Sequence, residues 1–137
     1  MTPTTLADFL HLSHRPDLGI VAARWTRPAE SGELRAGYQA MLHYAASCGS
    51  CNRWLIDSRR RLQVDAQDVH WLTTEFYPTL RRHLHEHVYL AFLIAPYQAD
   101  HVQDDTLPPL PYTHGDYCSL NQFIDEGEAV RWLTSRS

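Results

Sequence analysis

The strongest constraint on the fold of this 137-residue chain is an eight-residue apolar run, Val88 to Ala95. Because apolar side chains occupy consecutive positions, a strand formed by this run would bury both of its faces. Such strands lie at the centre of a sheet with helices packed on either side. The run is far shorter than the ~18 apolar residues needed to cross a bilayer. The sequence therefore predicts an α/β domain with no membrane span.

Four further segments have strand patterns. They are residues 6–12, 20–26, 54–56 and 120–124. A turn at residues 16–19 joins the first two, which predicts an antiparallel hairpin. The later strands are joined through helices, and this predicts parallel neighbours with right-handed crossovers. A proline-containing loop over residues 97–116 precedes the last strand.

Three segments have the periodicity of amphipathic helices. Ser31 is placed to cap the first and Gly49 to end it. The second begins at Asp65, with Pro78 ending or kinking it, and Asp125 caps the third. The resulting order is β, β, α, β, α, β, loop, β, α. We predict one domain over residues 1–137, with a mixed sheet of about five strands and helices packed on it.

The charge of the chain argues against one class of function. Its 12 basic residues, all arginine, are outnumbered by 16 acidic ones, giving a formal net charge of −4. Nucleic-acid binding needs a clustered excess of basic side chains, so we expect no nucleic-acid partner. Protonation of all nine histidines would move the net charge from −4 to +5. No basic segment leads into an apolar one at the start, which favours a cytoplasmic location.

A candidate site lies where the third predicted strand ends, at Asp57, Ser58, Arg59, Arg60 and Arg61. Ligands of open α/β sheets bind at the carboxyl ends of the strands. The three guanidinium groups favour an anionic ligand or partner, although surface charge runs are as often merely solvated. Asp57 is a candidate general base or metal ligand, but a carboxylate here more often caps a turn or pairs with arginine. Ser58 more often satisfies backbone groups than accepts phosphate.

Cysteines and histidines give two weaker candidates. Cys48 and Cys51 form a C-x-x-C pattern, which is typical of redox sites when it opens a helix. Here it closes a helix, so the dipole is reversed and loop cysteines are favoured. His83, His85 and His87 would share one face if extended, and with the cysteine pair they could hold zinc. A structural zinc site usually has two paired motifs, so a polar connection is favoured over metal.

The order of elements and three motifs resemble the STAS and SpoIIAA-like domains, especially an uncharacterised bacterial branch of that fold. The resemblance covers about residues 6–134. The motifs are Arg53-Trp54-Leu55-Ile56-Asp57, Leu93-Ile94-Ala95-Pro96 and Phe123-Ile124-Asp125-Glu126-Gly127-Glu128-Ala129-Val130-Arg131-Trp132-Leu133.

This resemblance implies a SpoIIAA-like fold and a small non-enzymatic module that works through protein contacts or ligand binding. In the signalling members, a kinase phosphorylates a Ser or Thr that follows an Asp where the third strand meets its helix, and this switches partner binding. Asp57 and Ser58 match that pattern. The glycine and immediate helix start that follow in the family are absent, because residues 59–64 intervene.

The sequence thus favours a regulatory or protein-interaction module without a cofactor, binding a protein partner or a second copy of itself. The alternative is a small binding protein for an anionic or lipid-like ligand, because the related CRAL-TRIO fold enlarges a similar sheet into a pocket. That pocket would lie near Trp54 or Trp71, with the 97–116 loop as a lid. An enzyme is least favoured, since no nucleophile-base-orienter set, glycine-rich phosphate loop or strong metal motif is present.

Overall fold

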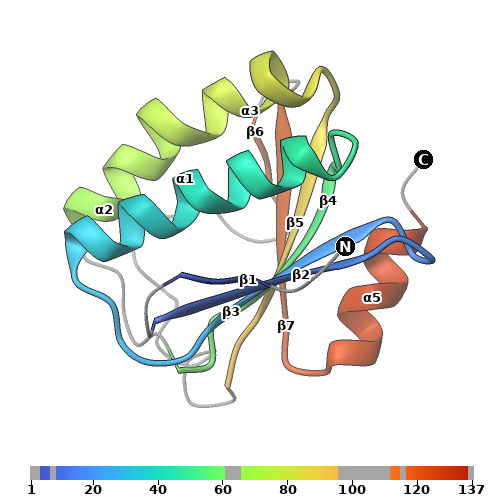
Figure 1. Cartoon of the computed structure of the whole chain (residues 1–137), viewed down its shortest axis with the longest axis horizontal. Coiled ribbons are helices and arrows are strands. Elements are labelled where there is room, and N and C mark those ends of the chain that lie inside the picture. The colour runs from blue at the N-terminus through green and yellow to red at the C-terminus, as the bar shows by residue number, and fades with distance from the viewer. Residues whose placement is uncertain (1–3, 7–8, 61–65, 96–111, 115–116, 136–137) are drawn as a thin grey trace.

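The computed structural model describes residues 4–6, 9–60, 66–95, 112–114 and 117–135. These residues form a seven-stranded mixed sheet in the order β1-β2-β3-β4-β5-β7-β6 (Figure 1). The strands are β1 (Thr4–Leu6), β2 (Leu10–Arg15), β3 (Ile20–Trp25), β4 (Arg53–Asp57), β5 (Val88–Leu93), β6 (Tyr112–His114) and β7 (Cys118–Phe123). The helices are α1 (Ser31–Ser47), α2 (Ala66–Trp71), the π-helix η1 (Leu72–Phe76), α3 (Tyr77–Leu84) and α5 (Glu126–Thr134).

The predicted α/β class and mixed sheet are confirmed. The pairs β3–β4, β4–β5 and β5–β7 are parallel, and β1–β2, β2–β3 and β6–β7 are antiparallel. The carboxyl ends of β3, β4, β5 and β7 therefore lie along one edge of the sheet, which we call the carboxyl edge. The two three-residue strands β1 and β6 extend the sheet beyond the strands that the sequence patterns predict.

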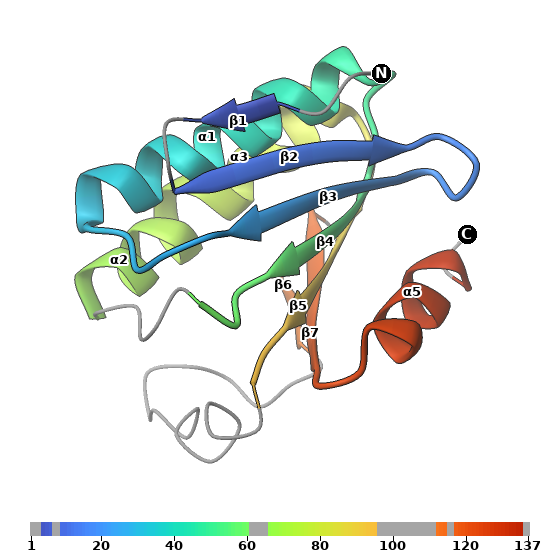
Figure 2. The same ribbon diagram turned by 60° about the horizontal axis from the view of Figure 1, so that its bottom comes forward.

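Helices cover both faces of the sheet, as the apolar run in β5 predicts. Helices α1, α2 and α3 lie on one face and α5 lies on the other (Figure 2). The first face buries the larger core, to which β5 contributes Val88, Leu90 and Phe92. The second buries a smaller cluster in which Leu55 and Ala91 pack against Ala129 and Leu133 of α5. Alternate residues of β5 thus enter two separate cores.

The N-cap of helix α1 lies one residue before the predicted cap, Ser31. Glu30 is the N-cap, and its side chain and that of Glu33 form a reciprocal capping box, with the Glu30 backbone N–H donating to Glu33 Oε1 at 3.1 Å. Ser31 is therefore the first helical residue rather than the cap. The far end is as predicted, because Gly49 follows the C-cap with a φ of 78°, a value that glycine adopts without strain.

The second predicted helix is interrupted by η1, which ends two residues before Pro78. Proline has no N–H to donate, and its ring crowds the carbonyl four residues earlier, so the helix widens there. The hydroxyls of Thr73 and Thr74 donate to the carbonyl of His70, at 3.2 and 2.6 Å. The predicted break at Pro78 thus takes the form of a π-turn. The predicted cap, Asp65, lies outside the described residues.

Two strand boundaries differ from prediction. The single strand predicted over residues 6–12 is divided between two strands, because Leu6 of β1 pairs antiparallel with Leu10 of β2. The last strand ends at Phe123, which leaves Ile124 exposed. Of the predicted 97–116 loop, only residues 112–114 are described, and they form β6. No helix among the described residues has the length and apolar character required to cross a membrane.

Candidate functional site

The candidate site lies at the carboxyl edge, where β3 and β4 end side by side. Arg24 and Asp57 are register partners in this parallel pair, so their side chains emerge on the same face of the sheet. Asp57 is only 8% exposed and follows four apolar or half-buried residues of β4. The Asp57 carboxylate therefore lies at the end of the buried strand β4, at the edge of the sheet and beside the Arg24 guanidinium of β3.

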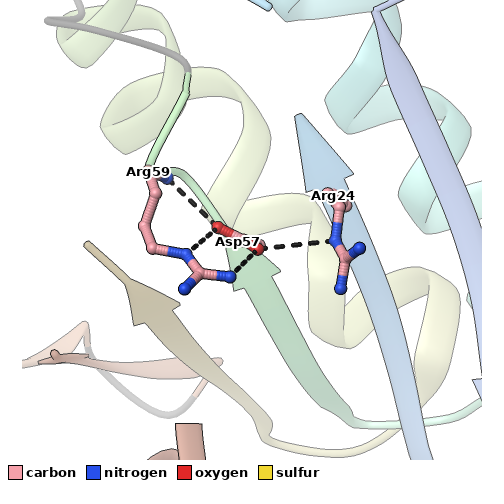
Figure 3. Close-up of polar contacts among 3 residues, drawn as sticks. All are labelled: Arg24, Asp57 and Arg59. Carbon is pink, nitrogen blue, oxygen red and sulfur yellow. Dashed lines mark hydrogen bonds and ion pairs between the residues drawn. The ribbon is translucent and has the colours of Figure 1, made fainter. Parts of the chain in front are cut away.

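Asp57 accepts hydrogen bonds from Arg59 and makes an ion pair with Arg24 (Figure 3). Its Oδ1 accepts from the Arg59 backbone N–H at 3.2 Å and from Arg59 Nε at 3.0 Å. Its Oδ2 accepts from Arg59 Nη2 at 2.8 Å and lies 3.5 Å from Arg24 Nε. The carboxylate thus fixes the turn after β4 and orients two arginine side chains, Arg59 of that turn and Arg24 of β3.

These contacts hold Asp57 in its charged form. Burial alone would raise the pKa of Asp57, but the hydrogen bonds from Arg59 and the charges of Arg59 and Arg24 outweigh burial, so the pKa lies below its usual range. Hydrogen bonding to Asp57 in turn raises the pKa of Arg59. A carboxylate with a lowered pKa and with both oxygens occupied by arginine is a poor proton acceptor. The arrangement therefore argues against the general-base role that the sequence left open.

Ser58 lies beneath this surface. It is 2% exposed, and its backbone N–H donates to the Leu93 carbonyl at 2.8 Å, which extends the β4–β5 ladder by one residue. A kinase could reach the hydroxyl only after this strand end opened. The exposed residue that follows the turn is Arg60, and Arg61 lies outside the described residues.

The site carries an excess of positive charge. Arg24, Arg59 and Arg60 supply three guanidinium groups against the one carboxylate of Asp57, a difference of +2 among these four side chains. Arg24 and Arg59 are both largely solvent-accessible, and Arg60 is exposed. The negative charge of Glu126, in the first turn of α5, also acts on Arg59. What this edge can do chemically is bind a carboxylate or phosphate group.

Sequence patterns did not identify Arg24 as part of the site. It is more than thirty positions away from Asp57, and only the parallel register of β3 and β4 brings the two together. One signal was present, since an arginine between Ala23 and Trp25 is the charged position of an otherwise apolar strand. Charged residues near the ends of strands that are predicted to pair in parallel are therefore worth considering as one group.

The cysteine and histidine candidates are not brought together. Cys51 is buried, and its thiol donates to the carbonyl of Gly19 at 3.1 Å, while burial raises its pKa. His83 lies on α3, His85 is its left-handed cap with a φ of 63°, and His87 Nε2 lies 2.7 Å from Ser119 Oγ. The three histidines therefore do not share one extended face. Among the described residues, no group of three potential metal ligands is assembled.

The two tryptophans named for a ligand pocket have different surroundings. Trp54 belongs to the main core, packs near Phe76, and donates its indole N–H to the Cys51 carbonyl at 3.0 Å. Trp71 is half-buried and borders a depression on the surface of α1 and α2.

Comparison with protein-family models, curated proteins and solved structures found no match. Likeness to STAS domains therefore stays a prediction.

Proposed function

We propose that the protein is a non-enzymatic, STAS-like regulatory module that binds an acidic segment of a protein partner at its carboxyl edge. The observation that carries this proposal is Asp57 shared between Arg24 and Arg59. One carboxylate orients two guanidinium groups yet neutralises only one of them. The remaining positive charge, together with that of Arg60, faces solvent at the end of two parallel strands.

Electrostatic reasoning supports a partner with several negative charges. An exposed ion pair contributes only about 0.2–1 kcal/mol, so one carboxylate would bind weakly. Arg24 and Arg59, oriented by Asp57, and the exposed Arg60 next in sequence can meet several carboxylates at once. Such charge complementarity raises the association rate and selects the partner. The Arg59 guanidinium is pre-organised by two hydrogen bonds to Asp57, which lowers the ordering cost of binding.

Arg60 is the position at which this proposal is best tested. Its side chain is exposed, so Arg60→Ala removes charge without disturbing the Asp57 contacts. Ser58→Glu is a poorer probe, because it places a larger charged group where the side chain is buried and would disturb the end of β4.

Affinity capture from extracts of the native host, with mass spectrometry of the bound proteins, is the decisive measurement. We expect an acidic partner whose binding falls about tenfold in Arg24→Ala/Arg60→Ala and weakens with added salt. The matched control is Arg82→Ala, an exposed arginine on α3, which should capture the partner as the wild type does. Equal capture by the double variant would contradict the proposal.

A second function, binding of a small anionic or lipid-like ligand, draws on the same guanidinium groups. Arginine pairs of this kind suit phosphate as well as carboxylate. Native mass spectrometry of protein from its own host separates the two functions, because a retained small molecule and a retained protein differ in mass. The same spectrum would reveal self-association or a phosphate on Ser58.

A further inference from the structure

A second polar site lies on the opposite side of the sheet from α5, where α1 meets α2 and η1. It is a surface depression of about 480 Å³. The lining residues are Arg35 of α1 and Gln67, His70, Trp71, Thr74 and Glu75 of α2 and η1. The spacing of the latter five places them on one stripe of the helix, and Leu72 and Phe76 are buried away from it. The depression therefore presents the polar face of one helix to an arginine of another.

Arg35 is held in place by two contacts. Its guanidinium lies 5.4 Å from the centre of the Trp71 ring, and Trp71 stacks on the buried Phe76 with ring centroids 5.5 Å apart. Its Nε is buried and lies 3.5 Å from Oδ1 of Asp68, which is 4% exposed. The Arg35 side chain nevertheless remains 44% exposed. The guanidinium is thus oriented by protein contacts, while part of the side chain stays open to solvent.

Glu75 supplies the opposite charge in the same depression. It is exposed, and within the described part of the chain neither Glu75 nor Arg35 pairs with the other. A guanidinium that is paired with Asp68 behind it and a separate exposed carboxylate therefore border one hollow without pairing with each other. Thr74 adds a hydroxyl oxygen that can accept a hydrogen bond, since its proton is donated to the His70 carbonyl at 2.6 Å.

We propose that this depression binds a small zwitterion, an amino acid or a short ω-amino acid. The carboxylate of the ligand pairs with the Nη groups of Arg35, a bidentate geometry that guanidinium favours. The ammonium group is held by Glu75 and the Thr74 hydroxyl. A simple anion would gain at Arg35 but be repelled by Glu75, with Asp68 behind it. A simple cation would gain at Glu75 but would leave the Arg35 guanidinium without a ligand carboxylate. The site is independent of the carboxyl edge and of the function proposed there.

The test is a titration with unbranched ω-amino acids from glycine to 6-aminohexanoate, followed by NMR of the Trp71 indole N–H and the Arg35 Nε–H. Hexanoate and hexylamine, each carrying one of the two charges, are the comparison ligands. We expect saturable binding with a Kd of about 1 mM for the best-fitting chain length, as suits a ligand of few atoms in an open site. Each comparison ligand should bind about tenfold more weakly.

Glu75→Gln is the deciding variant, because an exposed position tolerates the change without loss of folding. It should weaken the zwitterion about tenfold and leave hexanoate unweakened, whereas Arg35→Gln should weaken both. Glu86→Gln and Arg82→Gln, exposed positions outside the depression, are the matched controls and should bind as the wild type does. The proposal is overturned by equal binding of hexanoate, by undiminished binding in Glu75→Gln, or by no saturation with any chain length.

Discussion

At the scale of single residues, Asp57 shows how one buried carboxylate organises a surface. It lies at the end of a strand whose apolar side chains fix its position, and it receives hydrogen bonds from Arg59 while pairing with Arg24. The two arginines remain accessible, so the buried charge determines the geometry of the exposed ones. Removing the carboxylate would free both guanidinium groups and also loosen the turn that follows β4.

Replacing Asp57 by Asn should lower the free energy of unfolding by about 1–3 kcal/mol at neutral pH. The folded-state pKa lies below the unfolded value of about 3.9, so the contribution of the carboxylate is complete above that pH and is lost as pH falls through the folded pKa. Urea denaturation of wild type and variant from neutral pH to below pH ~4 measures this. We expect the two stabilities to converge in acid, and a pH-independent difference would show that packing, not charge, is responsible.

The sequence predicted the contacts between residues that are close in the chain, but not the contacts between distant segments. The Asp57 turn and the Arg59 pair are local, two residues apart, and the pattern at the strand end indicated both. Arg24 is joined to Asp57 only through the pairing of β3 with β4, which no local pattern specifies. The burial of Ser58 likewise depends on its bond to Leu93 of β5, a contact between distant segments.

At the scale of elements, α1 is positioned by contact with one tryptophan of the sheet. Gly37 faces the ring of Trp25, which is fully buried against Phe9 and Tyr38. A Cβ built on Gly37 would lie 2.5 Å from Cη2 of that ring, too close for any real contact. The absent side chain is therefore what lets the helix approach the sheet.

Gly37→Ala should destabilise the protein by about 1–2 kcal/mol, because overpacking outweighs the higher helix propensity of alanine. Gly32 in the same helix provides the control, since a Cβ there meets no atom within 4 Å, and Gly32→Ala should be neutral or stabilising by up to about 1 kcal/mol. Urea denaturation followed by far-UV circular dichroism compares the two. An equal effect of both substitutions on stability would mean that the Trp25 ring can shift to admit the new Cβ with little loss of free energy of unfolding.

The elements themselves were predicted well where periodicity was long and less well at their ends. Helical spacing predicts that Leu34, Tyr38, Met41, Leu42 and Ala45 form one apolar stripe of the first helix. All of them are buried except Leu42, which is half-buried. The division of the first predicted strand into β1 and β2 was missed, because two paired strands can keep the same alternation of side chains as a continuous one. The Glu30 cap was missed because serine, one residue later, is the commoner capping residue.

At the scale of the whole molecule, the sheet separates two cores of unequal size. Helix α5 covers β4, β5 and β7, whereas the same face of β2 and β3 presents His11, Ser13, Ala22 and Arg24, none of them buried. The solvent-facing side chains include many histidines and no lysine, so the charge of the surface responds strongly to mild acid.

We expect solubility to pass through a minimum in mildly acidic solution. The formal net charge moves from −4 toward +5 as the nine histidines become protonated, so it must cross zero on the way. Static light scattering of the purified protein between neutral pH and pH ~5 detects this, and scattering should fall again at lower pH as the net charge becomes positive. Flat scattering across the range would count against this expectation.

The strands at the two ends of the sheet affect whether this protein can pair with other molecules through its backbone. In the described structure the outermost strands, β1 and β6, are each three residues long. A strand from another molecule would find only a short ladder of backbone groups to extend, and short edge strands are one way in which proteins avoid fibrous assembly. Backbone pairing at the ends of the sheet is then disfavoured as a mode of association, whereas both sites proposed above depend on side-chain contacts.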